Sequence, residues 1–416
     1  MFGLLGKTLK HSLSKEIHAS FGNKAYHLVE TDDVSSFLTM KDFTGFNVTI
    51  PYKEQIIPYL DHLEGYASFA GAVNTIVQKN GSWIGYNTDY DGFKQLLNHY
   101  HINLMYKKVL IIGNGGSSKT IEAVCVNEHV SSVKKICRHP KNEGEISLQD
   151  LPLVKDYDIL INTTPIGMYP HNEDELFFPL EEIPTLTEVI DLVYQPLQTN
   201  LVLKAKLLGI KAVGGLYMLV AQAATAHELF FNLSISSLQI EQTYRQIKKM
   251  MYNIVLIGLP LSGKSKYAKI FGEITDKIVV DTDALIEKQQ EKKVSEIFEE
   301  FGEKPFRQME SDLVDSIYKS LNQVISTGGG MVLNDSLMMK LKQNGLVFFL
   351  DKSPDRIANL SIQNRPLIKG SDDVYRLAKE RYPLYKKYAD YIIHIEHDTV
   401  YHSKEMEGII DEYLSY

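Results

Sequence analysis

The chain has 416 residues, a formal net charge of −8 and a hydrophobic content of 44%. This length exceeds one ordinary domain, and the composition is that of globular domains with buried cores, which excludes a disordered or fibrous chain. The acidic excess is divided evenly between the two halves, so neither half has the basic character of a nucleic-acid-binding protein.

The cysteines, the apolar runs and the first residues of the sequence indicate the cellular compartment. Cys125 and Cys137 are the only cysteines and match no zinc or redox spacing, which favours a reducing compartment. No apolar run approaches the ~20 residues that cross a membrane, and the first residues do not resemble a secretory signal. We therefore expect a cytoplasmic protein that acts without a membrane or nucleic-acid partner.

Residues 1–100 mix short strands and helices and contain four polar stretches, HSLS, FNVTIPYKE, GAVNT and GYNTDYDGF. Hydroxyls, amides, one lysine and one carboxylate suit a polyol pocket, in which a lysine beside a carboxylate can pass a proton to a carbonyl oxygen during reduction. Taken alone, each residue is more often an ordinary surface group, so the hypothesis depends on their combination. The candidates are Ser12, Ser14, Asn47, Thr49, Lys53, Asn74 and Asp89.

Near Lys107 a nearly continuous apolar run, KKVLIIG, predicts a buried parallel strand. It leads through GNGGSSK into a helical pattern, so Gly113, Asn114, Gly115 and Gly116 are predicted to form a dinucleotide-binding turn. A turn that only packs the helix is the alternative. Strands and helices alternate further along, which predicts an open parallel sheet, until the pattern turns helical at GLYMLVAQA.

A second strand, glycine loop and helix begins at MMYNIVLIGLPLSGKSKYAK, with no linker, which places a junction near residues 246–252. GLPLSGKS fits the phosphate-loop pattern, whose backbone N–H groups cradle phosphates while the lysine reaches the outer phosphates and the hydroxyl binds Mg²⁺. A chance match is disfavoured by the strand before and the helix after. The predicted nucleotide-binding residues are Gly258, Ser262, Gly263, Lys264 and Ser265.

Residues beyond this loop indicate the phosphate acceptor. Asp281 and Asp283, two apart in VVDTDALIE, are predicted to face one side of a strand end, toward a metal and the acceptor. Arginines and an aspartate around a small pocket suit a substrate with one carboxylate and several hydroxyls. The other candidates are Arg307, the glycines Gly329 and Gly330 of STGGG, Arg365 and Arg381.

The ordered motifs of residues 1–249, including NVTIPYK, GAVNT, NTTPIGM and GLYMLVAQA, resemble shikimate dehydrogenase. The resemblance implies a substrate-binding domain split between residues 1–102 and 215–249, around a Rossmann-type NADP-binding domain at 103–214. It implies that Lys53 and Asp89 are the catalytic pair. The implied substrate-binding residues are Ser12, Ser14, Asn47, Thr49, Asn74, Tyr194 and Gln222.

The resemblance also implies NADPH, whose 2′-phosphate would be held by Arg138 in CRHPK. Cys137 and His139 stand where the family has asparagine and threonine. No acidic residue stands there to bind a ribose 2′-hydroxyl, so NADP remains favoured over NAD.

Residues 250–416 resemble shikimate kinase, which implies a P-loop domain around a central parallel sheet. Lys264 and Arg365 would stabilise the transferring phosphoryl group, and Ser265 and Asp281 would hold Mg²⁺ beside ATP. Asp283 would accept the proton of the attacking hydroxyl. The implied shikimate-binding residues are Asp283, Arg307, Gly329, Gly330 and Arg381.

The sequence therefore predicts an α/β bifunctional enzyme of the chorismate pathway. The first half would reduce 3-dehydroshikimate to shikimate with NADPH, and the second would phosphorylate shikimate with ATP and Mg²⁺. One alternative is that one half is inactive and acts as a nucleotide-binding regulatory module. Another is that the first half acts on quinate and the second is a different small P-loop kinase. The sequence leaves the oligomeric state open.

Overall fold

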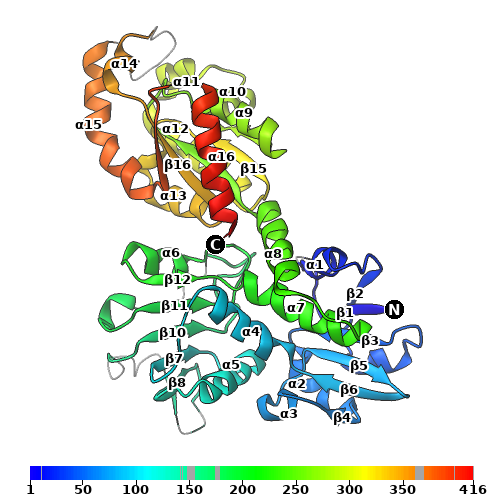
Figure 1. Ribbon diagram of the computed structural model, residues 1–416. Helices are drawn as coiled ribbons and strands as arrows, with labels where there is room; N and C mark the ends of the chain where they lie inside the picture. The colour runs from blue at the N-terminus through cyan, green and yellow to red at the C-terminus, as the bar shows by residue number, and fades with distance from the viewer. Residues whose placement is uncertain are drawn as a thin grey trace. The chain divides into compact units, whose positions relative to one another are not determined.

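The computed structural model describes the chain apart from residues 11, 141, 143, 148–154, 174–178, 361–369, 398 and 416. The chain forms two compact units, Met1–Ile247 and Lys248–Tyr416 (Figure 1). The boundary falls within the junction predicted at residues 246–252. We describe each unit by itself.

Unit 1 contains a mixed sheet built from its first 86 residues. Its strands are β1 (Phe2–Gly6), β2 (Tyr26–Glu30), β3 (Gly45–Val48), β4 (His62–Leu63), β5 (Thr75–Lys79) and β6 (Ser82–Tyr86), in the order β2-β1-β3-β5-β6-β4. Strand β1 pairs in parallel with β2 and β3, whereas β5 pairs antiparallel with β3 and β6. Leu5, Phe46 and Ile76 are completely buried and form the centre of the core on this sheet.

The second sheet of unit 1 is parallel throughout its described pairings. Its strands are β7 (Lys108–Ile112), β8 (Ser132–Ile136), β9 (Glu145–Ile146), β10 (Ile159–Asn162), β11 (Glu188–Asp191) and β12 (Lys211–Val213), in the order β12-β11-β10-β7-β8-β9. The central strands are runs of Val, Ile and Leu because helices cover both faces of a parallel sheet. The open parallel sheet predicted from the sequence is confirmed.

Helices of unit 1 position the polar side chains of the first half. They are α1 (Ser14–Ser20), α2 (Tyr52–Gln55), α3 (Ala67–Ala70), α4 (Thr88–His99), α5 (Gly116–Asn127), α6 (Asn200–Leu207) and α7 (Leu216–Phe231). Helix α8 (Ser237–Met251) begins in unit 1 and ends in unit 2. Helix α7 is apolar on most sides and packs closely along α4, with α1 and β5 also in contact. Residues 216–231 thus lie against elements from the first hundred residues.

Unit 2 has a five-stranded parallel sheet in the order β14-β15-β13-β16-β17. Its strands are β13 (Asn253–Ile257), β14 (Ile278–Asp281), β15 (Gln323–Ser326), β16 (Gly345–Asp351) and β17 (Tyr391–His394). The central strand β13 is buried at all five residues. This agrees with the predicted P-loop domain around a central parallel sheet.

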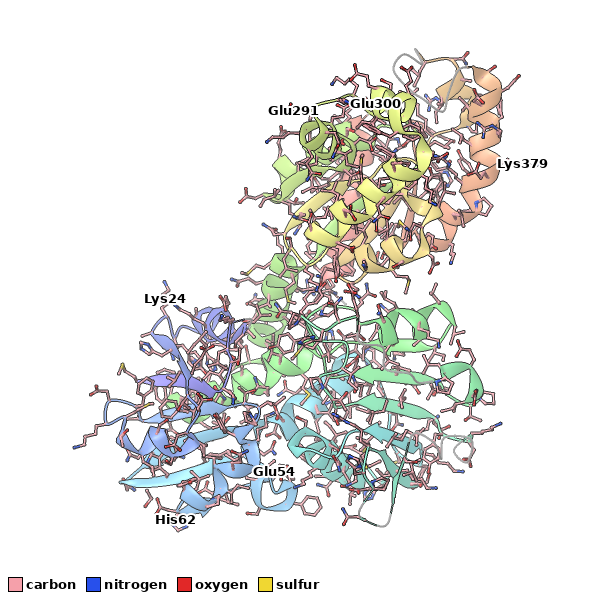
Figure 2. All side chains as sticks on the ribbon, turned by 180° about the vertical axis from the view of Figure 1, so that it is seen from behind. Lys24, Glu54, His62, Glu291, Glu300 and Lys379 are labelled. Atoms are coloured by element: carbon pink, nitrogen blue, oxygen red, sulfur yellow. The ribbon has the colours of Figure 1, made fainter. Side chains whose placement is uncertain are left out.

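Helices α9 to α16 surround the sheet of unit 2. They are α9 (Lys264–Thr275), α10 (Thr282–Gln290), α11 (Val294–Phe301), α12 (Glu303–Ile317), α13 (Asp335–Lys342), α14 (Pro354–Ala358), α15 (Ser371–Tyr388) and α16 (Thr399–Ser415). Charged residues such as Glu54, Glu291 and Lys379 are exposed and project outward from the ribbon (Figure 2). Among the described residues, no helix is long and apolar enough to span a membrane.

Lys277, just before β14, is a buried lysine in unit 2. Its Nζ donates to the backbone oxygens of Lys249 (3.0 Å) and Tyr252 (2.9 Å) and to Oδ1 of Asn322 (3.0 Å), and it lies 3.8 Å from the Tyr252 ring centroid. Burial, and then the positive charge of Lys249, lower the pKa of Lys277 from 10.5 to about 7. The ammonium form is therefore disfavoured in the folded unit.

We predict that Lys277 makes the stability of unit 2 depend on pH. Because the folded-state pKa is depressed, the unfolded chain binds more protons between about pH 7 and pH 10, and stability rises with pH in this window. Lys277→Met should remove this rise. Circular dichroism follows the unfolding of both units in urea, whereas fluorescence of Trp83, the only tryptophan, follows unit 1 alone. An unfolding transition that is seen by circular dichroism but not by fluorescence therefore belongs to unit 2. Equal pH slopes in the parent and variant proteins would contradict the prediction.

Candidate functional sites

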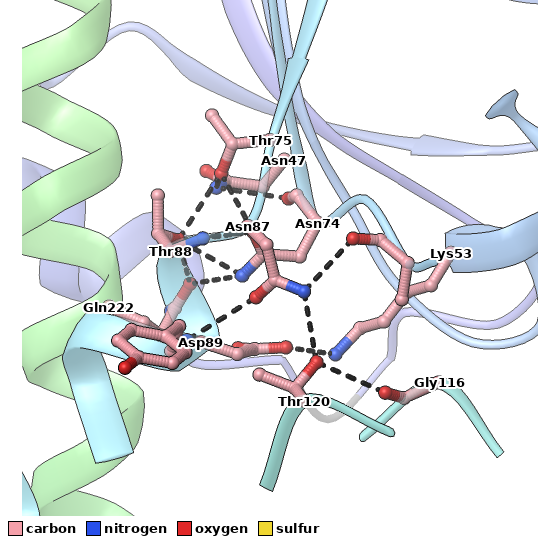
Figure 3. Close-up of polar contacts among 12 residues, drawn as sticks. Asn47, Lys53, Asn74, Thr75, Asn87, Thr88, Asp89, Gly116, Thr120 and Gln222 are labelled. Carbon is pink, nitrogen blue, oxygen red and sulfur yellow. Dashed lines mark hydrogen bonds and ion pairs between the residues drawn. The ribbon is translucent and has the colours of Figure 1, made fainter. Parts of the chain in front are cut away.

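The predicted acid–base pair of unit 1 forms in the structure. Nζ of Lys53, on α2, lies 2.6 Å from Oδ2 of Asp89, in the first turn of α4. The two side chains are 18% and 10% exposed, so the pair is shielded but reachable from one side. Figure 3 shows them pointing toward one another. This ammonium can donate a proton to a substrate oxygen while the carboxylate holds it in place.

Asn87 connects this pair to the predicted dinucleotide turn. Its Oδ1 accepts from the N–H of Tyr90 and so caps α4, and its Nδ2 donates to Oγ1 of Thr120 on α5 (2.9 Å). Thr120 in turn donates to the backbone oxygen of Gly116 (3.1 Å). A Cβ built on Gly116 would lie 3.6 Å from Cβ of Lys53, so the turn passes directly beside this lysine.

Next to the pair, amides and hydroxyls from three distant segments meet. Nδ2 of Asn74 donates to Oγ1 of Thr88 (3.0 Å) and to Oε1 of Gln222 on α7 (3.3 Å), and Oγ1 of Thr88 also donates to Oε1 of Gln222 (3.3 Å). Figure 3 shows this group beside Asp89. Such a set can bind the hydroxyls of a polyol because every member can donate or accept a hydrogen bond.

The other predicted substrate residues are placed more loosely. Oγ of Ser12 donates to Oγ of Ser14, the first residue of α1 (3.1 Å), and Thr49 is half-buried just after β3. Asn47 is buried within β3 and contacts the group through Thr75, to whose Oγ1 its Nδ2 donates at 3.0 Å. In the part of the chain that the structure describes, no hydrogen bond joins Tyr194 to these side chains.

The dinucleotide turn connects β7 to the start of α5. Gly113 has φ +111°, which favours glycine, and a Cβ there would lie 2.6 Å from Oγ1 of Thr163. Asn114 and Gly115 are exposed, and a Cβ on Gly115 would meet nothing within 4 Å. The N–H groups of a helix start beside open space fit the pyrophosphate of a dinucleotide.

Arg138 is exposed just beyond the carboxyl end of β8, where the sequence predicted a 2′-phosphate contact. A carboxylate also lies at this strand end. Oε2 of Glu145, on the neighbouring β9, is 3.9 Å from Sγ of Cys137 and accepts from the N–H of Asn142. Burial, and then Glu145, raise the pKa of Cys137, so its side chain is a neutral thiol and adds no negative charge next to Arg138.

Unit 2 contains a cavity of about 690 Å³ at the carboxyl ends of its strands. It brings together almost every predicted kinase residue that the structure describes. The predicted residues that line it are Gly263, Lys264, Ser265, Asp281, Asp283, Arg307, Gly329, Gly330 and Arg381. Gly258 and Ser262 belong to the same loop behind the lining, and Arg365 lies outside the described residues.

The phosphate loop is held by its own lysine. Nζ of Lys264 donates to the backbone oxygens of Gly258 and Leu259, both at 2.9 Å, and Oγ of Ser265 lies 3.4 Å from Oγ of Ser326. Leu261, within this loop, has φ +67°. A left-handed conformation costs a non-glycine residue about 1–2 kcal/mol, so this loop is closed at some energetic cost.

Asp281 and Asp283 both line the cavity, but the prediction that they share one strand face is wrong. Asp281 ends β14 and caps α10, its Oδ1 accepting from the N–H of Ala284, whereas Asp283 lies in the first turn of α10. The apolar run simply ends one residue before the helix begins. Both carboxylates reach the cavity because a strand end and a helix start meet there.

Glu310 is a site residue that the sequence analysis missed. Its Oε2 pairs with Nη1 of Arg307 at 2.6 Å, and its side chain is 1% exposed. A Cβ on Gly328 would lie 2.6 Å from Oε1 of Glu310 and 2.8 Å from Oδ1 of Asp283, so both carboxylates press on this glycine. Burial raises the pKa of Glu310, and Arg307 opposes the shift. The sequence could have indicated Glu310, because it lies three residues after Arg307 on a helix, a spacing at which opposite charges pair.

The backbone of STGGG is fastened by α15. The oxygen of Gly329 accepts from Nη1 of Arg381 (3.0 Å) and from the hydroxyl of Tyr385 (2.5 Å). A Cβ on Gly330 would lie 2.2 Å from Nη2 of Arg307, so any larger residue there would have to displace this guanidinium group. These contacts hold two guanidinium groups and a glycine turn around one small space. The two units together define a dinucleotide-type oxidoreductase fold followed by a phosphate-loop kinase fold.

Comparison with known proteins specifies the families. Residues 4–76 match the family model for the shikimate dehydrogenase substrate binding domain. The chain is 36% identical over 253 residues to "Shikimate dehydrogenase (NADP(+))" of Methanococcus maripaludis, covering 55% of this chain and 91% of that protein. The chain therefore belongs to the shikimate dehydrogenase family. Residues 260–414 match the family model for shikimate kinase, so it also carries a shikimate kinase domain.

Solved structures agree with the first assignment. A chorismate mutase/shikimate 5-dehydrogenase fusion protein from Clostridium acetobutylicum has a TM-score of 0.56 at 29% identity, covering 60% of this chain and 97% of that one. Shikimate 5-dehydrogenase from Thermus thermophilus, solved with NADP(H) and shikimate, has a TM-score of 0.53 at 30% identity, covering 59% and 98%. Nearly the whole length of each of these two proteins aligns with this chain.

We predict that the site of unit 1 depends on the close approach of α4 and α7 at Gly92. A Cβ there would lie 2.8 Å from Cβ of Gln222 and 2.9 Å from the backbone oxygen of Met218. Gly92→Ala should push the helices apart, lower the free energy of unfolding of unit 1 by about 1–3 kcal/mol and reduce dehydrogenase activity. Urea unfolding followed by Trp83 fluorescence measures the first effect. Kinase activity of the same protein is the internal control, and an unchanged midpoint would refute the prediction.

Proposed function

We propose that the chain catalyses two consecutive reactions on one carbon skeleton. Unit 1 reduces 3-dehydroshikimate to shikimate, and unit 2 phosphorylates the shikimate 3-hydroxyl. The observation that supports this is that each unit gathers its polar side chains beside its own nucleotide-type glycine turn. Family membership of both halves supports the same assignment.

In unit 1, NADPH supplies the hydride when it is bound at Gly113–Gly116 with Arg138 near its 2′-phosphate. Lys53 donates the proton to the carbonyl oxygen that is being reduced, and Asp89, at 2.6 Å, fixes the position of its ammonium group. Asn74, Thr88 and Gln222 bind substrate hydroxyls, and Ser12, Ser14 and Thr49 bind the remaining polar groups. We assign Tyr194 to the same pocket from the family resemblance.

In unit 2, ATP supplies the phosphoryl group when it is bound at the phosphate loop. Ser265 and Asp281 would hold Mg²⁺, which at such sites is bound by one or two carboxylates, substrate phosphates and several waters. Asp283 accepts the proton of the attacking hydroxyl, and Arg307 and Arg381 bind the carboxylate of shikimate. Glu310 keeps the Arg307 guanidinium in place, and Lys264 with Arg365 neutralises the transferring group.

The domain limits that accompany this proposal are residues 1–102 with 215–249, 103–214, and 250–416. The packing of α7 against α4 and α1 supports the return of the chain to the first domain after the nucleotide-binding part. We place the enzyme in the cytoplasm with small-molecule substrates. A regulatory role for an inactive half is not favoured, because Lys53, Asp89, Lys264 and Asp283 are all present.

We predict that the full chain converts 3-dehydroshikimate to a phosphorylated product only when both nucleotides are supplied. Protein is mixed with 3-dehydroshikimate, ATP and Mg²⁺, and NADPH absorbance and ADP release are followed together. ADP should appear only after NADPH is added. NADPH oxidation without ADP would reject the kinase assignment, and ADP without NADPH would show a different acceptor. Replacing 3-dehydroshikimate by 3-dehydroquinate tests the quinate alternative.

We predict that single substitutions separate the two activities. Lys53→Met removes the proton donor and should lower the dehydrogenase kcat by about 10²- to 10⁴-fold while leaving kinase kcat unchanged. Asp283→Asn removes the proton acceptor without a change of size and should do the reverse. Each variant serves as the folding control for the other, measured on one preparation by NADPH and ADP assays. Simultaneous loss of both activities in either variant would contradict the assignment.

A further inference from the structure

We call Asn74, Thr88 and Gln222 the proposed substrate group of unit 1. Behind it lies a buried polar cluster that the mechanism above does not use. It consists of His18 on α1, Tyr26 on β2 and Asn47 on β3, which are 1%, 2% and 5% exposed. The rings of His18 and Tyr26 stack with centroids 4.1 Å apart. Polar side chains buried this deeply are costly unless they are hydrogen-bonded, so their arrangement is informative.

Both rings donate to the same atom. Oδ1 of Asn47 accepts from the hydroxyl of Tyr26 at 2.7 Å and contacts Nε2 of His18 at 3.1 Å. On its other side, Nδ2 of Asn47 donates to Oγ1 of Thr75 (3.0 Å) and faces the backbone oxygen of Asn74 (3.5 Å). A backbone oxygen only accepts, so the amide nitrogen must face it, and the amide oxygen must face the two rings.

The protonation of His18 agrees with this orientation. Burial, and then the neighbouring His227, lower the pKa of His18 to about 3, so the ring is neutral at physiological pH. Nδ1 of His18 has no hydrogen-bond partner within the described chain. A neutral ring carries one N–H, and the partnered nitrogen is Nε2, which therefore donates to Asn47.

The orientation of Asn47 extends into the substrate group. Because Oγ1 of Thr75 accepts from Asn47, its own hydrogen is free to reach Oδ1 of Asn74 (3.3 Å). Oδ1 of Asn74 also accepts from the N–H of Thr88 at 2.7 Å, which leaves Nδ2 of Asn74 facing Gln222 (Figure 3). The donors therefore run from the two rings through Asn47 and Thr75 to Asn74, whose orientation the N–H of Thr88 also supports, as in other cooperative networks.

We propose that His18 and Tyr26 are positioning residues of the dehydrogenase: together they set the amide orientation of Asn47, and through Thr75 they set the polar atoms that Asn74 and Gln222 present to substrate. His18 also ties Asn47 to α1, the helix that begins with Ser14, another substrate-binding candidate. This inference rests on the proposed function of unit 1, but it concerns residues that do not touch substrate.

The test removes the two donors while keeping the rings. His18→Phe and Tyr26→Phe should each raise the KM for shikimate about 3- to 10-fold, the worth of one net hydrogen bond. The double variant should exceed the product of the single effects, because the oxygen of Asn47 then has no donor. Only the contacts of its Nδ2 with Thr75 and with the backbone oxygen of Asn74 still favour the present orientation. The KM for NADP⁺ and the kinase kcat should not change. Trp83 fluorescence verifies that unit 1 is folded in each protein.

Two further variants separate positioning from packing. His18→Gln retains an N–H at a similar distance along the side chain and should restore the KM for shikimate to within about 2-fold of the parent. His227→Leu is the matched control. His227 is buried beside the cluster, and its ring stacks on His18 with the centroids 5.8 Å apart. This substitution should lower the stability of unit 1 without raising the KM for shikimate.

If the double variant is folded and its KM for shikimate equals that of the parent, the proposal is wrong and the cluster only contributes to packing. Calorimetric titration with shikimate in the presence of NADP⁺ gives the same comparison as a Kd. The titration tests the positioning role separately from the proposed reaction of unit 1. If the parent protein binds shikimate without turning it over, the proposed reaction is refuted. Weaker binding of shikimate by the double variant would still support the positioning role.

Discussion

A parallel strand that ends in a glycine turn and continues at once into a helix is the constraint on which both units depend. β7 leads through Gly113–Gly116 into α5, and β13 leads through the phosphate loop into α9. At such a junction several backbone N–H groups have no partner within the helix and point out of the sheet edge. Other site residues lie near these donors: Lys53 lies beside Gly116 in unit 1, and Asp283 and Arg307 line the same cavity as the phosphate loop in unit 2.

The two sites reach this common plan with different chemistry. The group proposed to bind substrate in unit 1 is an amide and hydroxyl network in which Asn74, Thr88 and Gln222 contact one another, and its geometry depends on residues far apart in the chain. The substrate side of unit 2 is a set of charges, with Glu310 buried against Arg307 and Arg381 fastened to the backbone of Gly329. Neutral networks are directional and cooperative, whereas buried ion pairs fix position through strong but costly contacts.

Sequence reasoning found the parts that short motifs encode. The strands before each glycine turn, the Lys53–Asp89 pair and most of the cavity lining of unit 2 follow from residue order, because local patterns determine them. It misplaced Asp283, since an apolar run does not show where a strand passes into a helix. It missed Glu310, His18 and Tyr26, because their role comes from partners brought together by folding, and a single buried histidine or glutamate has no distinctive pattern in sequence.

The contrast between neutral and charged pockets gives the two halves different sensitivity to ionic strength. At physiological salt the Debye length is about 8 Å, so added ions weaken attraction between a carboxylated substrate and the arginines of an open cavity before contact is made. The pocket of unit 1 binds hydroxyls through amides, and its lysine is paired with Asp89 at 2.6 Å, so it has little net charge for ions to screen. Rising salt would therefore slow capture of the shared intermediate by unit 2 more than its release from unit 1, and free shikimate would accumulate between the two reactions.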